Sequence, residues 1–419
     1  MKHNFWILSS LFSNACITGL STLLPLYIIY HNGTVLDVAF ALSLFNLALI
    51  ISAMFWGYFI DTFSLRKKII VISYLGLTLA VCLLFFVKNL FFVGLIYGFA
   101  GFMRAGSQPA IHILIMETNQ KKDWGQVFAR TELFAVLGMI VAAIFGAFWT
   151  IFFGLDSFIL VCFCFGVFSL FLAQLLISEP KINFEIEIVS KFPSSLIQRI
   201  RSNPIVLPKI PSFKEVDTLL KMLKSQMLQG FPLFLFSIFC FYAASAVYFT
   251  SIIPFMKSKL VSDFLIFIVY LILYLTQAFV FSFSSKFVNM YGEKFSTIFS
   301  FLPRMFGIIL TVFAAIYLSS NDLLLFIIVS FIALDIALSI YVTSTSLILF
   351  KLLPFKRRGY YLGIFGATTG AGLFFGSFMS GSLSSYFGFS IAFIVAAIFL
   401  AISFLIMRIF NKRNEIGVE

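Results

Sequence analysis

The chain has 419 residues, of which 61% are hydrophobic and only 11% are charged, and its formal net charge is +12. Soluble domains carry roughly 25% charged residues, so this composition and the mean hydropathy of +1.06 exclude a water-soluble protein. The chain must use the lipid bilayer as its solvent, and we expect an all-α membrane protein.

Twelve apolar segments are long enough to cross a bilayer as helices, since one crossing takes about 20 residues. The predicted spans are residues 5–30, 36–60, 69–87, 90–116, 127–152, 156–178, 229–256, 262–284, 296–319, 322–350, 359–386 and 389–410. Several connections are only a few residues long, so consecutive helices are expected to run antiparallel.

The loops carry most of the positive charge. Apart from Arg104 and Arg304, which fall inside spans, 24 Lys and Arg residues lie on the membrane side that holds both termini and three lie on the other side. Cationic loops stay in the cytoplasm, so we predict a multi-pass cell-membrane protein with both termini cytoplasmic. The positive charge is attributed to contact with anionic lipids, and no nucleic-acid partner is expected.

Residues 179–228 form the only long polar segment and divide the spans into two sets of six. We therefore predict an N-terminal six-helix bundle at 1–178, a cytoplasmic linker at 179–228 and a C-terminal six-helix bundle at 229–419. The end of the linker, SFKEVDTLLKMLKSQML, has the pattern of an amphipathic helix. It could lie on the inner membrane surface or pack on the bundle.

The two halves resemble each other in sequence. GYFIDTFSLRK, after the second span, aligns with SKFVNMYGEKF, after the eighth, at an offset of 228 residues. FGLDSFILV and FGFSIAFIV, at the starts of the sixth and twelfth spans, align at an offset of 234. Parallel halves related by an axis along the membrane normal are a transporter architecture.

With these features the sequence resembles the major facilitator superfamily over nearly its whole length. Gly57, Asp61 and Arg66 match that family's loop motif G-x-x-x-D-R-x-G-R-R/K, whose other positions differ here, and the second copy keeps Gly292 and Lys294. The resemblance implies two pseudo-symmetric bundles of six helices. It also implies that the loop braces the second span against the eleventh, as a latch at the cytoplasmic gate.

Ionisable residues inside a membrane cost several kcal/mol unless they are paired or hydrated. Arg104 and Asp335 lie near the middle of the fourth and tenth spans, 231 residues apart. In the family these spans line the central cavity, so the resemblance implies that the two face each other across it. A working pair, broken by substrate or proton, and a static buried pair are both compatible with the sequence. Arg304, in the ninth span, is expected to snorkel toward the inner surface.

Other polar residues complete the predicted pathway. Glu132 could belong to the inner gate or carry protons. The polar or amphipathic groups that could line a cavity are Asn14, Asn46, Gln108, Tyr242, Tyr248, Gln277 and Tyr341. This supply of hydrogen-bonding groups is modest, which favours an amphiphilic or weakly polar solute.

The function predicted from the sequence is a permease: a secondary active transporter of a small organic solute, working by alternating access and coupled to protons. We expect a monomer without cofactor or metal, and not an enzyme, because the sequence has no P-loop and no cluster of metal-ligating residues. The alternatives are a membrane enzyme acting on lipid-linked substrates and a non-transporting sensor with a carrier fold.

Overall fold

The computed structural model describes residues 5–62, 65–118, 124–178, 230–318, 320–352 and 358–416, so the predicted linker and its amphipathic helix lie outside the described residues. These residues form twelve helices, and the predicted all-helical fold is confirmed. The helices are α1 (Ile7–Tyr30), α2 (Val35–Thr62), α3 (Arg66–Leu84), α4 (Leu90–Thr118), α5 (Trp124–Phe152), α6 (Phe158–Leu176), α10 (Phe231–Ser258), α11 (Asp263–Tyr291), α12 (Glu293–Tyr317), α13 (Ser320–Leu352), α14 (Arg358–Phe387) and α15 (Phe389–Ile416).

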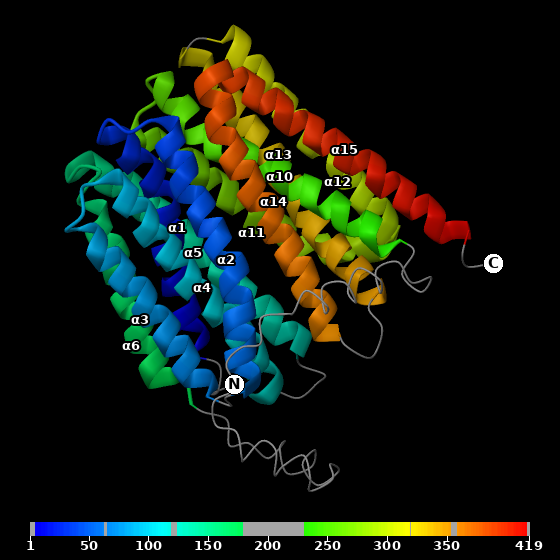
Figure 1. The fold of residues 1–419 in the computed structure, drawn as a ribbon, viewed down its shortest axis with the longest axis horizontal. Coiled ribbons are helices and arrows are strands. Elements are labelled where there is room, and N and C mark those ends of the chain that lie inside the picture. Colours follow the sequence, from blue (N-terminus) through cyan, green and yellow to red (C-terminus); the bar gives the residue numbers. More distant parts are fainter. Residues whose placement is uncertain are drawn as a thin grey trace, which may run out of the picture.

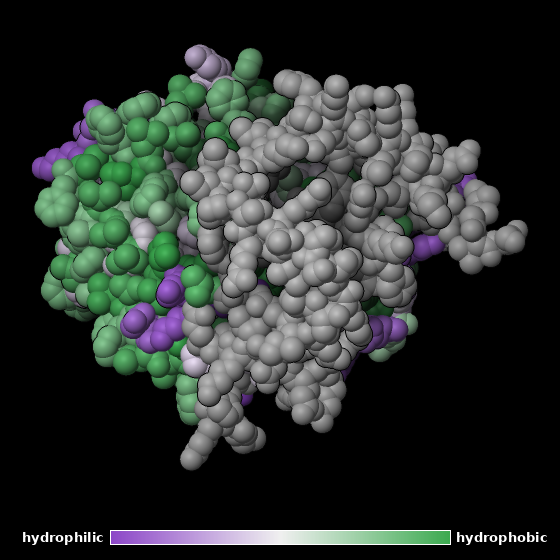
Figure 2. Space-filling model, turned by 60° about the horizontal axis from the view of Figure 1, so that its bottom comes forward, coloured by the Kyte–Doolittle hydropathy of each residue, from purple (hydrophilic) through white to green (hydrophobic). Residues whose placement is uncertain are grey.

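Eleven of the twelve described helices are long and apolar enough to cross a membrane. The exception is α14, whose many Gly, Ser and Thr residues lower its hydropathy. It packs against α2, α10 and α15, so its weakly apolar faces meet protein. Apolar side chains cover most of the described surface in Figure 2, and hydrophilic residues are confined to small patches. This surface suits a hydrocarbon environment.

The helices of the first half and of the second half pack in the same pattern. In the first half, α1 packs against α5 and α6, α4 against α2 and α3, and α3 against α6. In the second half, α10 packs against α14 and α15, α13 against α11 and α12, and α12 against α15. The halves meet where α2 contacts α14 and α5 contacts α11, and they diverge toward the lower part of Figure 1. Each contact therefore has a counterpart under exchange of the halves.

Two names for the faces of the molecule are used below. The linker side is the face at which α1 begins and α6 ends, and the turn side is the face of the short α1–α2 connection. Both chain ends of the described structure lie on the linker side, because each half has an even number of antiparallel helices.

Glycines permit the closest approaches between helices inside each half. A β-carbon on Gly138 of α5 would overlap the carbonyl oxygen of Leu11 in α1, and one on Gly376 of α14 would overlap that of Ala243 in α10. Small residues at such crossings let two backbones pack directly. In both equivalent pairs, α1–α5 and α10–α14, a glycine on one helix therefore allows the two backbones to pack closely.

Replacing Gly376 by Ala is expected to destabilise the protein by about 1–3 kcal/mol, because the added methyl group meets backbone that cannot move alone. Gly366→Ala in the same helix is the matched control, since a β-carbon at this position would meet no described atom of another helix within 4 Å. Thermal unfolding of the two purified variants measures the difference. Equal melting temperatures would show that the α10–α14 approach is not tight.

Candidate functional site

A cavity of about 210 Å³ lies between the two halves, in the turn-side part of the molecule. Five helices supply its walls: α1 and α2 from the first half and α10, α11 and α14 from the second. The lining residues are Ser21, Pro25, Leu42, Asn46, Ser245, Ala246, Phe249, Thr250, Ile253, Tyr270, Leu373 and Ser377. Hydroxyl groups, one amide and aromatic rings are thus its polar and polarisable groups, and none of these residues carries a charge.

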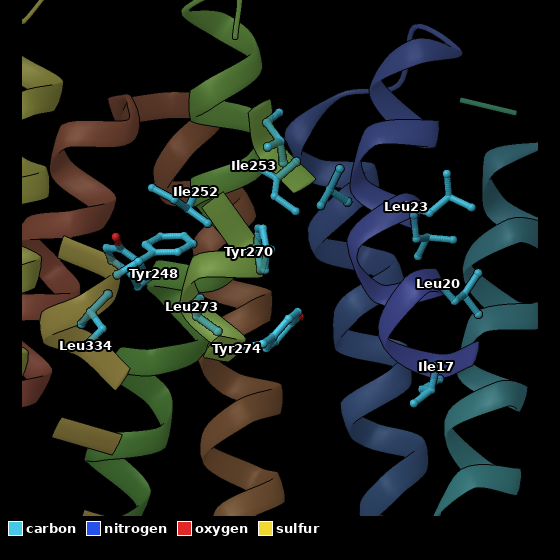
Figure 3. Packing of buried hydrophobic residues seen from close by; sticks show 14 of the residues in the cluster. Ile17, Leu20, Leu23, Tyr248, Ile252, Ile253, Tyr270, Leu273, Tyr274 and Leu334 are labelled. Carbon is cyan, nitrogen blue, oxygen red and sulfur yellow. The ribbon is translucent and has the colours of Figure 1, made fainter. Parts of the chain in front are cut away.

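The turn-side contacts between the halves close the cavity at that end. The Asn46 amide donates a hydrogen bond of 3.0 Å to the Ser377 hydroxyl, which joins α2 to α14. Phe158, at the start of α6, packs edge-on against Phe267 of α11 with their ring centres 5.3 Å apart. Figure 3 shows the side chain of Tyr274 of α11 directed toward the helices of the first half, and its hydroxyl interacts with Thr22 of α1. Among pairs of described residues, the hydrogen bonds and ring contacts between the halves all lie in this turn-side part.

Arg104 belongs to a polar cluster within the first half. Its guanidinium donates to the side-chain oxygen of Asn14 in α1 at 2.7 Å and to the Ser107 hydroxyl at 2.8 Å. The Asn14 amide in turn donates to the Ser10 carbonyl oxygen at 2.7 Å. Glu132 of α5 lies close enough to attract Arg104 electrostatically. The arginine is therefore fixed to α1 by a charge-assisted hydrogen bond.

The second half holds a buried arginine of its own, Arg304 of α12, with only 1% of its surface exposed. Arg304 donates to the Ser245 hydroxyl of α10 at 2.6 Å and to the Leu334 carbonyl oxygen of α13 at 3.2 Å. Its guanidinium also lies over the ring of Phe241, 4.4 Å from the ring centre, which is a favourable cation–π geometry. The arginine thus ties α10, α12 and α13 together.

Asp335, also 1% exposed, is electrostatically paired with Arg304. The two do not form a direct ion pair, and among the described residues Oδ2 of Asp335 and Nε of Arg304 have no hydrogen-bond partner. An isolated carboxylate at this depth would be very costly. The nearby guanidinium is the group that offsets this cost when Asp335 is ionised.

Two expectations drawn from the sequence differ from this arrangement. Arg104 is bonded to Asn14 and Asp335 is paired with Arg304, so each charge is held within its own half and they do not form a pair across the cavity. Arg304 does not snorkel to the surface. A sequence signal for its inward position exists: small or hydroxyl residues at helical spacing mark the buried face of α12, namely Ser296, Thr297, Ser300, Gly307 and Thr311.

The remaining pathway candidates, Gln108, Gln277 and Tyr242, are partly buried and none lines the 210 Å³ cavity. Tyr242 lies near enough to Arg304 to interact with it electrostatically. Of the turn-side lining, sequence reasoning named only Asn46 and missed the Ser and Thr residues, because such residues are common in membrane helices. Nothing in their spacing distinguishes Ser377. Roles for all these residues in transport stay predictions.

The predicted gate motif lies at the linker side. Gly57 and Asp61 belong to the last turns of α2, and the side chain of Asp61 lies outside the described part of the chain. Arg66 opens α3 and donates to the Ile60 carbonyl oxygen at the end of α2. In the second copy, Gly292 has φ of 81°, a left-handed conformation that favours glycine, and the Lys294 carbonyl accepts a hydrogen bond from Asn411. The latch itself stays a prediction.

Comparison with known proteins shows the same architecture in transporters. The sequence profile described as Major Facilitator Superfamily matches residues 6–307 and, in a second match, residues 234–417. No match was found among curated proteins.

Two solved structures superimpose over nearly the whole chain. A point mutant of the nucleoside transporter NupG has a TM-score of 0.72 at 14% sequence identity, with 97% of this chain and 98% of that chain covered. A POT family transporter in complex with 5-aminolevulinic acid has a TM-score of 0.68 at 14% identity, with 97% and 96% covered. At such low identity these similarities concern the fold.

The profile match, together with twelve described helices in two equivalent sets, identifies a membrane transporter of a solute and not an enzyme. The chain belongs to the Major Facilitator Superfamily. The transporter class and the family both agree with the resemblance that the sequence showed.

Arg304→Met is expected to cost about 3–5 kcal/mol of stability, because it leaves Asp335 buried without its cation. Adding Asp335→Asn should restore most of the loss, since the double variant has no unpaired buried charge. Melting temperatures of the purified variants test this. The control is Lys351→Met, which breaks a more exposed ion pair with Glu293 and should cost at most about 1 kcal/mol. An Arg304→Met variant as stable as the control would contradict the pairing.

Proposed function

We propose that this protein is a secondary active transporter that moves a small organic solute by alternating access. The observation that carries the proposal is the cavity between the halves, whose walls come from both halves and whose turn-side end is closed. A site that two rigid halves share can be opened to one side and then to the other by rocking one half against the other. Asp61 and Arg66 would act as the latch on the linker side.

The orientation follows from charge. With 24 cations on the linker side against three on the turn side, the linker side is proposed to face the cytoplasm. The arrangement described above, closed at the turn side, then corresponds to a carrier shut toward the outside.

The lining of the cavity supports a neutral or weakly polar solute. Its residues offer hydroxyl groups, the Asn46 amide and the rings of Phe249 and Tyr270, but no charge. Recognition by hydroxyls and an amide suits a solute with several neutral hydrogen-bonding groups on an apolar frame. Of the two similar structures, the nucleoside transporter handles a solute of this kind, whereas 5-aminolevulinic acid carries charged groups.

Proton coupling is proposed through Asp335. Ser245 lines the cavity and also accepts the hydrogen bond from Arg304, which is paired with Asp335. The Ser245 hydroxyl and the Arg304 guanidinium therefore link a solute in the cavity to Asp335, the only described carboxylate in the core of the second half. A solute that bonds to Ser245 would compete with Arg304 for it, and the position of Arg304 decides whether Asp335 is better protonated or ionised.

The function is tested by a thermal-shift screen of the purified protein against neutral and charged solutes at two pH values. The best binder is then measured for uptake into proteoliposomes with and without a proton gradient. Uptake establishes a transporter, and binding without any uptake would indicate a sensor.

A disulfide across the turn-side contact should stop transport. In a chain with its five native cysteines replaced, Asn46→Cys with Ser377→Cys places two thiols on neighbouring side chains, whose polar atoms now bond at 3.0 Å. A disulfide forms between them when helix motion brings the two Cβ atoms to within about 4.5 Å. Oxidation should abolish uptake and a reductant should restore it. Each single cysteine serves as its control. Full uptake by the cross-linked protein would rule out opening at this contact.

Asp335→Asn should abolish accumulation driven by a proton gradient but leave exchange of solute intact, because the amide keeps the shape of the side chain and cannot carry a proton. Uptake and exchange are compared in the same proteoliposomes. If the variant still concentrates solute under a proton gradient, Asp335 is not the carrier and Glu132 is the next residue to test.

A further inference from the structure

A second cavity, of about 370 Å³, lies on the outer surface of the first half and is independent of the transport site. It opens between α5 and α6. The residues that line it are all apolar: Phe12, Val141, Phe145, Trp149, Leu160, Val161, Cys164, Phe165 and Phe168. We call it the α5–α6 groove.

The groove exists because α5 and α6 both pack against α1 and leave a gap between each other. Both α5 and α6 pack along α1, but they make few contacts with each other. Phe12 of α1 lies beneath the gap, 5.8 Å from the ring centre of Phe168. Phe145 and Phe168 stand at the sides of the gap with 47% and 55% of their surfaces exposed. Protein side chains therefore leave a furrow that runs along the helix axes.

The groove matches one leaflet of a bilayer in position and length. From Val141 to Trp149 it extends about 12 Å at 1.5 Å per residue, and half of the hydrocarbon core is about 15 Å thick. Its turn-side end is marked by Trp149, whose indole N–H donates to the Ser157 hydroxyl at 2.8 Å. Tryptophan with a polar partner is typical of the membrane–water interface.

We propose that the α5–α6 groove binds one acyl chain of a phospholipid from the turn-side leaflet. The lining offers no hydrogen-bond partner to a polar ligand, and the surface around it faces lipid. Association inside a membrane is driven by packing, and a flexible chain fills an irregular furrow better than a second helix could. The bound chain completes the packing behind α1, whose opposite face carries Asn14, the partner of Arg104 of α4.

The experiment uses Trp149 as a reporter in the full chain, with Trp6, Trp56 and Trp124 replaced by Phe. The protein is reconstituted in phosphatidylcholine bilayers that contain an increasing fraction of phosphatidylcholine brominated in mid-chain, which quenches a tryptophan in contact. We expect strong quenching of Trp149, and loss of most of it when Cys164→Phe fills the groove. Cys82→Phe, on the surface of α3, is the matched control and should leave the quenching unchanged.

Val161→Phe is a second variant that fills the groove, and it replaces Cys164→Phe in the test if that variant does not fold. Melting temperatures show which variants are folded. Equal quenching in the folded filling variants and in the control would overturn the proposal, because it would mean that Trp149 meets only bulk lipid. Quenching that develops only when the protein is diluted in the bilayer would also overturn it, since a second copy of the chain would then cover the groove.

Discussion

The hydrogen bond from Arg304 to Ser245 joins the wall of the cavity to the buried charges of the second half. It fixes a buried guanidinium to α10, and through the Leu334 carbonyl the same guanidinium reaches α13 beside Asp335. In a membrane protein no bulk water can solvate these groups, so each must find its partner inside. The packing of α10, α12 and α13 around Arg304 therefore depends on this small polar centre.

The two halves build this centre with different chemistry at equivalent places. Asn14 and Ser245 are 231 residues apart, as are Arg104 and Asp335, and Arg304 corresponds in the same way to Ser73. In the first half the cation comes from the fourth helix and binds an amide on α1. In the second half the position equivalent to Arg104 is the acid Asp335 on α13. The cation there is Arg304, which comes from α12. The helices of the two halves thus pack in the same pattern, but the charged residues at equivalent positions differ.

Small residues allow the helices to approach closely. Some lie at helix contacts inside one half, and others lie at the contact between the halves. Gly138 and Gly376 bring backbones into contact within each half, whereas Gly370 and Gly381 of α14 make room for Ile50 and Ala39 of α2 in the other half. The first kind makes each half one packed unit. The second kind lies at the contact between the halves. Between the described residues of α2 and α14, one amide, that of Asn46, supplies the hydrogen bonds, to the Ser377 hydroxyl and the Leu373 carbonyl oxygen. Close packing of small residues therefore makes up most of this contact between the halves.

Composition and hydropathy determined the membrane class, the number of helices and most of their bounds, because each crossing needs a long apolar run of its own. The offset between the halves gave the equivalence of Arg104 and Asp335 as well. Only the tertiary structure decided which charges meet. The small and hydroxyl residues of α12 mark its inward face, but that Arg304 and not Arg104 accompanies Asp335 depends on how α12 packs against α13 and reaches Ser245 of α10. A one-dimensional pattern marks the face of a helix that is buried and carries no information about which helices that face will meet.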